Sequence, residues 1–273
     1  MPNGKIFSQT WIITGDNVIN LSIGIACYIK DNPKLQTIYT QRCVDSIRKF
    51  VKIPYNLILV DNGSTEEGSK FLRDLNPEYL IRFQHNTGTS HAFNSIVNLS
   101  NTEYCYIPNN DHAVCEGSIE GMLNVLKTQD EYKVIGLPDT NWATKEGEYK
   151  YGGDFKTLID HDNFDLDKWN EASKVFANAQ KNEIEPTFVG SNYMFSKKTW
   201  ENFGTFRIST HKGWCAVDNY LEEDLMARDI KFCQYMKGII YHPPGGQGTS
   251  KYVPMQPEQW RLQYLKNMNA NIR

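Results

Sequence analysis

Three short polar clusters follow apolar runs in the sequence, and each carries residue types that can bind a ligand. The first is Asp61-Asn62-Gly63-Ser64, where a carboxylate can accept a hydrogen bond from a base N–H while glycine lets the backbone turn. The second, Asn86–Asn94, places glycine and hydroxyl residues at a predicted helix start, where backbone N–H groups suit anions. The third is Asn109-Asn110-Asp111-His112, whose carboxylate can bind Mg²⁺ or Mn²⁺ that also bridges a diphosphate.

Each cluster also has a simpler interpretation. An Asx turn or a helix cap explains the first two clusters when they are considered alone. His91, within the second cluster, is most simply a residue on a helix surface. A single aspartate after a strand is usually a turn residue, but Asp111 is aligned with two other polar strand ends, which favours a ligand role.

The elements that must position these clusters alternate between strand and helix. Apolar runs predict strands, and apolar residues at helical spacing predict the helices between them. The predicted strands are Leu21–Tyr28, Tyr55–Val60, Tyr79–Phe83, Tyr104–Pro108 and Lys133–Leu137, and the predicted helices are Lys34–Val51, Ser69–Leu75, Thr89–Leu99 and Ser118–Lys127. This order predicts an α/β fold with a doubly wound, mostly parallel sheet and helices on both faces. Ligands bind such sheets beyond the carboxyl ends of the strands, where all three clusters fall.

The second half of the chain is less regular. Charged, aromatic and glycine residues dominate from about residue 140 to 186, and Trp142, Tyr151 and Trp169 there would suit a glycan. The elements predicted in this half are helices at Leu166–Gln180, from Lys197, at Asp218–Ala227 and at Pro257–Met268, and strands at Thr187–Ser196, Ile230–Tyr235 and Gly238–Tyr241. The glycine- and proline-rich stretch Pro243–Ser250 predicts a loop that could fold over a bound donor.

Composition argues against several classes of protein. The chain has 273 residues, 40% hydrophobic and 22% charged, which is typical of a soluble globular domain. A net charge of −3 without a long basic run argues against a nucleic-acid partner. Six cysteines without CxxC spacing predict neither a zinc site nor a disulfide framework, and they fit a reducing compartment. Because no signal peptide or membrane-length segment is found, we expect a cytoplasmic protein without a membrane span.

The order of the motifs resembles glycosyltransferase family two, whose members have the GT-A fold. The resemblance covers about Leu21 to His242 and rests on LSIGIACY, LILVDNGST, NTGTSHAFN, YIPNND, GSNYMFSKKTWENFGTF and VDNYLEEDLMARDIKF followed by IIYH. It implies a single-domain, metal-dependent, inverting enzyme of polysaccharide biosynthesis. Such an enzyme moves a sugar from a nucleotide diphosphate, here expected to be a UDP-sugar, to a hydroxyl of a glycan or glycoconjugate.

The resemblance also divides the chain and names its donor and metal sites. It implies an N-terminal extension (1–20), a nucleotide-sugar-binding half (21–139), an acceptor-binding and catalytic half (140–242) and a C-terminal loop and helix (243–273). The implied donor-binding residues are Ala26, Tyr28, Asp61, Asn86, Gly88, Asn110 and Asp111. Asp111 matches the last aspartate of the family's DxD metal motif, here Asn-Asn-Asp. His242 matches a position where histidine often completes the Mn²⁺ or Mg²⁺ site.

Catalytic and acceptor residues are implied in the same way. Asp218 matches the family's catalytic base, although Val217 stands where the usual glutamate is and Asp229 where the usual turn glycine is. The nearby carboxylates Glu222, Glu223 and Asp224 fit a solvated helix face better than a catalytic position. The implied acceptor-binding residues are Gly190, Ser191, Asn192 and Trp214.

Two other functions stay open at this point. A carbohydrate-binding protein without activity would use the same fold. A nucleotidylyltransferase would need a glycine-rich, basic loop after the first strand, where this sequence reads CYIKDNP.

Overall fold

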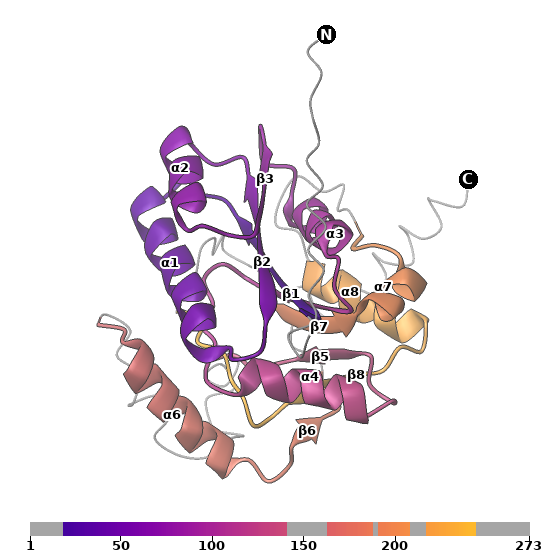
Figure 1. Cartoon of the computed structure of the whole chain (residues 1–273). Helices are drawn as coiled ribbons and strands as arrows, with labels where there is room; N and C mark the ends of the chain where they lie inside the picture. Colours follow the sequence, from indigo (N-terminus) through magenta and orange to yellow (C-terminus); the bar gives the residue numbers. More distant parts are fainter. Residues whose placement is uncertain (1–18, 141–162, 188–190, 208–216, 244–273) are drawn as a thin grey trace, which may run out of the picture.

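The predicted apolar runs form one sheet in the computed structural model, which describes residues 19–140, 163–187, 191–207 and 217–243 (Figure 1). The strands are β1 Leu21–Cys27, β2 Tyr55–Asn62, β3 Tyr79–Phe83, β4 Tyr104–Pro108, β5 Val134–Gly136, β6 Ile184–Glu185, β7 Asn192–Ser196 and β8 Phe232–Tyr235. Their order across the sheet is β3-β2-β1-β4-β7-β5-β8-β6. The fold is therefore the expected α/β fold, with β6 as a short strand that the sequence did not predict.

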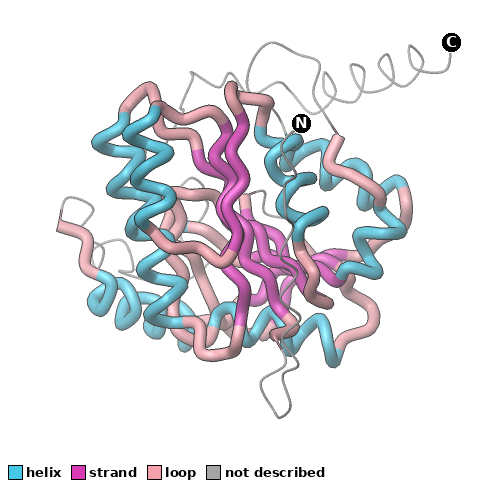
Figure 2. Tube along the Cα trace, turned by 45° about the horizontal axis from the view of Figure 1, so that its top comes forward, coloured by secondary structure: helices cyan, strands magenta, loops and turns pink. Residues whose placement is uncertain are grey.

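Helices cover both faces of this sheet, as Figure 2 shows. The helices are α1 Pro33–Phe50, α2 Glu66–Asp74, α3 Thr89–Leu99, α4 Ser118–Thr128, α6 Leu166–Ala179, α7 Lys197–Phe203 and α8 Val217–Ala227. Apolar residues of α1, α2 and α4 form one core with the sheet, and those of α3, α7 and α8 form a second core on the opposite face. No helix among the described residues combines the length and apolarity needed to cross a bilayer.

Strand direction determines which residues reach the functional edge. β1 pairs in parallel with β2 and β4, and β2 pairs in parallel with β3, so these strands end at the same edge. β7 runs antiparallel to both β4 and β5. Its first residue, Asn192, is paired with Pro108 at the end of β4. The reversed strand therefore brings its amino end to the edge where the parallel strands have their carboxyl ends.

Close packing at Gly24 holds α3 against the sheet. A Cβ atom at Gly24 would lie 1.9 Å from Cγ2 of Ile96 on α3, so a larger residue in β1 would push the helix away. Since α3 begins at Thr89, this contact also positions the Asn86–Asn94 cluster at the carboxyl edge of the sheet.

Several predicted boundaries differ from the structure for local reasons. Helix α2 begins earlier than expected because the Thr65 side chain caps it by accepting a hydrogen bond from the Gly68 N–H. The strand predicted at Thr187–Ser196 begins only at Asn192, since Ser191 has a φ of +133°. The Gly238–Tyr241 run forms isolated bridges rather than a strand. The predicted helix Pro257–Met268 and nearly all of the Pro243–Ser250 loop lie outside the described residues.

Candidate active site

Asp61 lies at the end of β2 and is fully buried. Its Oδ1 accepts a hydrogen bond of 2.8 Å from the Ser64 N–H, and its Oδ2 lies 3.5 Å from Nε of Arg82. Ser64 Oγ in turn accepts a bond of 2.9 Å from the Ile29 N–H after β1. The carboxylate therefore closes the turn after β2, and a nucleotide base would reach Oδ2 only after the groups that cover it have moved.

The loop before α3 is fastened to β2 by Asn62, a residue to which the sequence assigned no role of its own. Its Nδ2 donates to Asn86 Oδ1 at 3.1 Å and to the Gly88 carbonyl at 3.3 Å, and its Oδ1 accepts from the N–H and the hydroxyl of Thr87, both at 2.9 Å. Asn86 and Gly88 are exposed, and a Cβ atom at Gly88 would meet nothing within 4 Å. The amino end of α3 is therefore open beside Gly88.

The end of β1 lies between the first and third clusters. Cys27 is paired with Asp61 of β2, and Ala26 forms a parallel bridge with Asn109 after β4. Two strand spacings of about 4.8 Å each put the ends of β2 and β4 roughly 10 Å apart. Ala26 and Tyr28 are partly exposed, and burial together with the neighbouring Asp31 raises the pKa of the Tyr28 hydroxyl.

The third cluster forms a tight turn after β4. The His112 N–H donates to the Asn109 carbonyl at 3.2 Å, and Asn110 Nδ2 donates to the Thr40 hydroxyl of α1 at 3.0 Å. Ala113 pairs in antiparallel fashion with Tyr241 through two backbone hydrogen bonds of 2.9 Å. This pairing brings the residue after Tyr241, His242, to the turn that carries Asp111.

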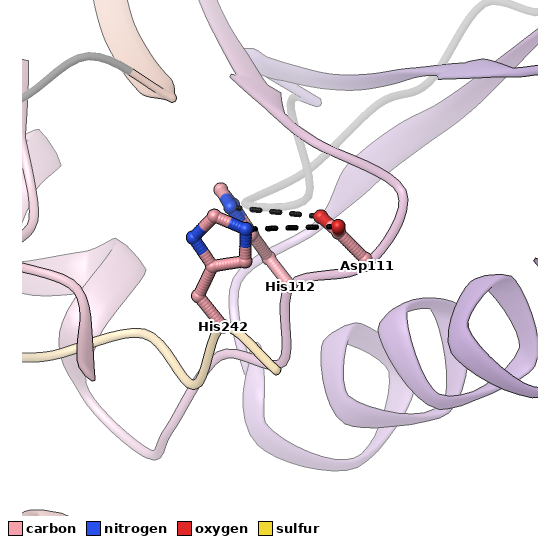
Figure 3. Close-up of side chains that lie close together, drawn as sticks. All are labelled: Asp111, His112 and His242. Atoms are coloured by element: carbon pink, nitrogen blue, oxygen red, sulfur yellow. Dashed lines mark ion pairs between the residues drawn. The ribbon is translucent and has the colours of Figure 1, made fainter. Parts of the chain in front are cut away.

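Figure 3 shows that one nitrogen of each imidazole of His112 and His242 is turned toward the Asp111 carboxylate. His242 Nε2 lies 3.6 Å from Asp111 Oδ2, and His112 Nε2 lies 3.8 Å from Asp111 Oδ1. The ring centroids of the two histidines are 4.8 Å apart. One ligand atom from each of these residues lies within 4.8 Å of the others, so together they could hold a metal ion.

A second carboxylate, Asp139, lies on the other side of His242. Its Oδ2 is 3.5 Å from His242 Nδ1, and Asp139 is itself 5% exposed. Burial by itself would lower the pKa of His242, but Asp111 and Asp139 outweigh it and raise the pKa to about 10. The metal-free protein therefore holds an imidazolium between two acids, and a cation must displace that proton.

His112 differs from His242 in its hydrogen bonding. It is fully buried, and burial followed by the charge of His242 lowers its pKa to about 4, so the ring is neutral. Its Nδ1 accepts a hydrogen bond of 3.3 Å from the Asn109 N–H, which leaves the ring proton on the Nε2 that faces Asp111. His112 would have to give up this bond to ligate a metal through Nε2.

The chemistry of the donor set fits Mn²⁺ better than Mg²⁺. Two atoms that each lie about 2.1 Å from one cation are roughly 3–4 Å apart, which is compatible with the 3.6 Å between Asp111 Oδ2 and His242 Nε2. Mg²⁺ takes oxygen ligands, whereas a mixed carboxylate and imidazole set suits a transition metal. Asp111 and His242 are therefore the two side chains that fit a Mn²⁺ ion best.

Asp218, in the first turn of α8, accepts a hydrogen bond at Oδ1 from the Tyr193 hydroxyl. That hydroxyl accepts a bond of 3.1 Å from the Ser191 N–H. Burial raises the pKa of Asp218, the Tyr193 hydrogen bond lowers it, and the charge of Asp139 raises it further. A carboxylate with a raised pKa, held by one oxygen, is suited to accept a proton through the other.

Sequence reasoning missed both Asp139 and Tyr193. A signal for Asp139 was present, since it follows the predicted strand Lys133–Leu137 as Asp61 and Asp111 follow theirs. Tyr193 gave no such signal, because a tyrosine within a strand is an ordinary core residue. Only the reversed direction of β7 places it beside α8.

Of the residues predicted to bind the acceptor, one lies at the edge of the site, one has a structural role and two are not described. Ser191 Oγ lies 3.4 Å from Asp139 Oδ2, at the edge of the site. Asn192 is fully buried, and its amide bonds the backbone N–H and C=O of Leu137 at 2.8 and 2.9 Å, so its side chain has a structural role. Gly190 and Trp214 lie outside the described residues. Trp169 is 2% exposed and its Nε1 donates to the Val114 carbonyl at 3.1 Å, which makes it a core residue and not a sugar platform.

Three solved structures of glycosyltransferases share this fold. The mannosyltransferase PcManGT from Pyrobaculum calidifontis, solved with GDP-Man and Mn²⁺, is 12% identical with a TM-score of 0.55, over 94% of this chain and 64% of its own. TarS 1–349 from S. aureus is 12% identical with a TM-score of 0.53, over 82% and 60%. GalNAc-T7, solved with UDP, GalNAc and Mn²⁺, is 13% identical with a TM-score of 0.56, over 88% and 46%. The chain therefore spans less than two thirds of the length of each.

Sequence comparison identifies the family. No curated protein matches the sequence. The family model described as "Glycosyl transferase family 2" matches residues 22–203, a range that includes Asp61, Asp111 and Asp139 and ends before Asp218 and His242. Together with the GT-A neighbours, this match shows that the chain belongs to glycosyl transferase family 2.

Proposed function

We propose that this protein is a Mn²⁺-dependent, inverting glycosyltransferase that moves a sugar from a UDP-sugar to a hydroxyl of a glycan or glycoconjugate. The observation that carries the proposal is the approach of His242 to Asp111, two residues far apart in the sequence, at the carboxyl edge of the sheet. Family membership supports the reaction class, and the donor set supports the metal.

The spacing of the strand ends supports a nucleoside diphosphate as the donor moiety. Asp61 at the end of β2 suits a base N–H, and Asp111 lies after β4, two strands away. A ribose would then lie over the end of β1, beside Ala26 and Tyr28. Because Asp61 Oδ1 is engaged by the Ser64 N–H, a base could bond only to Oδ2, which Arg82 Nε also approaches at 3.5 Å and which is uncovered only when the groups around it move. A single acceptor oxygen favours the single ring N–H of uracil over the two N–H groups of guanine.

Two acids have different roles in the proposed reaction: Asp111 binds the metal, and Asp218 is the base. A cation held by Asp111 and His242 would neutralise charge on the leaving diphosphate. Asp218 takes the proton of the acceptor hydroxyl, whose pKa is far above neutral, as the new bond forms. Tyr193 holds one oxygen of Asp218 and leaves the other for that proton. A single base of this kind supports direct displacement, which inverts the anomeric centre.

A donor panel tests the proposal. The full chain would be incubated with UDP-, GDP- and dTDP-sugars, with Mn²⁺ or with EDTA, and release of the nucleoside diphosphate measured with and without added glycans. We expect release from a UDP-sugar that needs Mn²⁺, and NMR of the product is expected to show inverted anomeric configuration. Glycan binding without turnover of any donor would instead identify a carbohydrate-binding protein, and retained configuration would contradict the direct displacement.

A further inference from the structure

We propose that Asp139 is a positioning residue that fixes the orientation of the His242 imidazole for metal binding. The inference rests on the proposed function, because it takes Asp111 and His242 as metal ligands. It concerns a different residue, which contacts the far side of the His242 ring and not the proposed ion.

The side chains of Asp139 and Asp111 contact opposite nitrogens of one imidazole. Asp139 Oδ2 lies 3.5 Å from Nδ1, and Asp111 Oδ2 lies 3.6 Å from Nε2. Asp139 and Asp111 are 5% and 6% exposed, so little water competes for either contact. When a cation displaces the Nε2 proton of His242, the remaining proton stays on Nδ1 beside the Asp139 carboxylate. The lone pair of Nε2 is then directed toward Asp111, on the opposite side of the ring.

The backbone supports the same orientation. Asp139 forms a parallel bridge with Ile240, two residues before His242. Thr140 and His242 then exchange two hydrogen bonds: the His242 N–H donates to Thr140 Oγ1 at 2.9 Å, and that hydroxyl donates to the His242 carbonyl at 3.0 Å. The segment after β5 thus carries the carboxylate and also clamps the backbone of the histidine.

The position of the Asp139 carboxylate is fixed in turn by the amino end of β7. Ser191 Oγ lies 3.4 Å from the oxygen that faces His242. Metal-ligating histidines commonly donate their second N–H to a carboxylate, and loss of that partner lowers metal affinity by about 10- to 100-fold. His112 lacks this arrangement, since its second nitrogen accepts a backbone N–H.

Mn²⁺ binding to the full chain tests the inference without a donor or acceptor. Free Mn²⁺ would be measured by EPR for the wild type, Asp139→Ala, Asp139→Asn, Asp111→Asn and Asp218→Asn, with the melting temperature of each metal-free variant recorded. We expect Asp139→Ala to weaken Mn²⁺ binding about 10- to 100-fold, with a smaller loss for Asp139→Asn, whose amide oxygen still accepts from Nδ1–H. Asp218→Asn is the control, because it removes a partly buried acid of the same site that is not a proposed ligand, and it should bind Mn²⁺ as the wild type does.

The dependence of kcat on Mn²⁺ concentration separates a positioning role of Asp139 from a purely structural one. A positioning role predicts that saturating Mn²⁺ restores kcat of Asp139→Asn to within a few-fold of wild type, because only metal affinity is lost. A kcat that stays low at every Mn²⁺ concentration would overturn the inference. If Asp139→Ala does not fold, Asp139→Asn alone decides between these results.

The variants also separate this inference from the proposed function. Wild-type Mn²⁺ affinity in Asp139→Ala, together with lost binding in Asp111→Asn, would overturn the role of Asp139 and leave the metal site standing. Wild-type affinity in Asp111→Asn would overturn the metal site itself, and the role of Asp139 with it.

Discussion

Two acids at the carboxyl edge of the sheet are held in contrasting ways. The β2 cluster consists of Asp61, Asn62, Ser64 and Arg82, and its contacts come mostly from residues close in sequence or on the adjoining strand. The β4 cluster consists of Asp111, His112, Asp139 and His242, and it is assembled from three segments of the chain. The first acid closes a turn, whereas the second is surrounded by titratable groups.

This difference indicates that Asp61 has mainly a structural role, whereas Asp111 lies where binding or catalysis can occur. One oxygen of Asp61 accepts a hydrogen bond from the Ser64 N–H, and this bond fixes the loop that a base would contact. Asp111 faces two imidazoles, one of which also faces a second carboxylate. Perturbed groups gathered in one place mark a site of binding or catalysis. Changes in the β4 cluster should therefore affect catalysis most, and changes in the β2 cluster should affect nucleotide affinity.

The largest expected effect is that of Asp111→Asn. Loss of the carboxylate removes a metal ligand worth several kcal/mol in the transition state, so kcat/KM should fall by about ten thousandfold. Steady-state kinetics with Mn²⁺ and the active UDP-sugar measure this, and Asp74→Asn, an exposed acid paired with Lys70, is the control. If Asp111→Asn kept an activity within tenfold of the wild type, the β4 cluster would not be the part of the site on which catalysis depends most.

Asp218→Asn should have the next largest effect. A general base contributes about 10²- to 10⁴-fold, so kcat should fall by roughly a thousandfold while the Kd for Mn²⁺ and for UDP stays unchanged. Single-turnover kinetics measure the fall in the rate of the chemical step, and direct binding measures the two Kd values. A matched variant is Asp224→Asn on the same helix, whose carboxylate pairs with Arg207. A larger loss of activity in Asp224→Asn than in Asp218→Asn would reassign the base.

Asp61→Asn should weaken UDP binding without changing Mn²⁺ binding. A hydrogen bond to a charged group is worth about 1.5–3 kcal/mol, so the Kd for UDP should rise roughly 10- to 100-fold. The asparagine still accepts from the Ser64 N–H, which keeps the turn intact. Calorimetric titration with UDP checks the change, and an unaltered Kd would mean that the buried Asp61 only closes its turn.

The smallest effect is expected from Tyr193→Phe, and it should appear in the pH profile. The Tyr193 hydrogen bond lowers the pKa of Asp218, so its loss raises that pKa further. A base must be ionised, and activity is lost as pH falls through its pKa, so the acid limb of kcat/KM should move to higher pH. The free energy of unfolding should fall by about 1–3 kcal/mol.

Tyr106→Phe is the matched control for this change. Tyr106 is a buried tyrosine of the adjoining strand β4, and its hydroxyl has no hydrogen-bond partner within the described residues. Its removal should leave both the pH profile and the stability close to those of the wild type. Equal shifts of the acid limb in the two variants would contradict the role given to Tyr193.

Most of the fold could be predicted from the sequence because it depends on local patterns. β3, β4 and α3 have the predicted bounds, since apolar periodicity and turn residues determine them. The reversal of β7 could not be predicted, because strand direction depends on long-range pairing with β4 and β5 and not on the pattern within Asn192–Ser196. The cap at Thr65 needed side-chain geometry that periodicity does not contain.

In the candidate site, residues that follow a predicted strand could be found from the sequence, whereas contacts between distant segments could not. Asp61 and Asp111 were found because each follows a buried strand, and the same rule applied to the strand before Asp139 would have found that residue too. The approach of His242 to Asp111 was expected only through family resemblance, since it depends on the pairing of Ala113 with Tyr241. The suggestion that Trp169 would suit a glycan was wrong, because α6 packs this side chain into the core against Tyr241.

The most direct test of the central claim is calorimetric titration of UDP into the full chain, with Mn²⁺ and then with EDTA. If Asp111 and His242 hold a cation that the diphosphate shares, UDP should bind with Mn²⁺ present and lose at least about tenfold in affinity with EDTA. Asp111→Asn should bind UDP as weakly with Mn²⁺ as the wild type does with EDTA. Tight UDP binding that is indifferent to EDTA and to Asp111→Asn would contradict the claim.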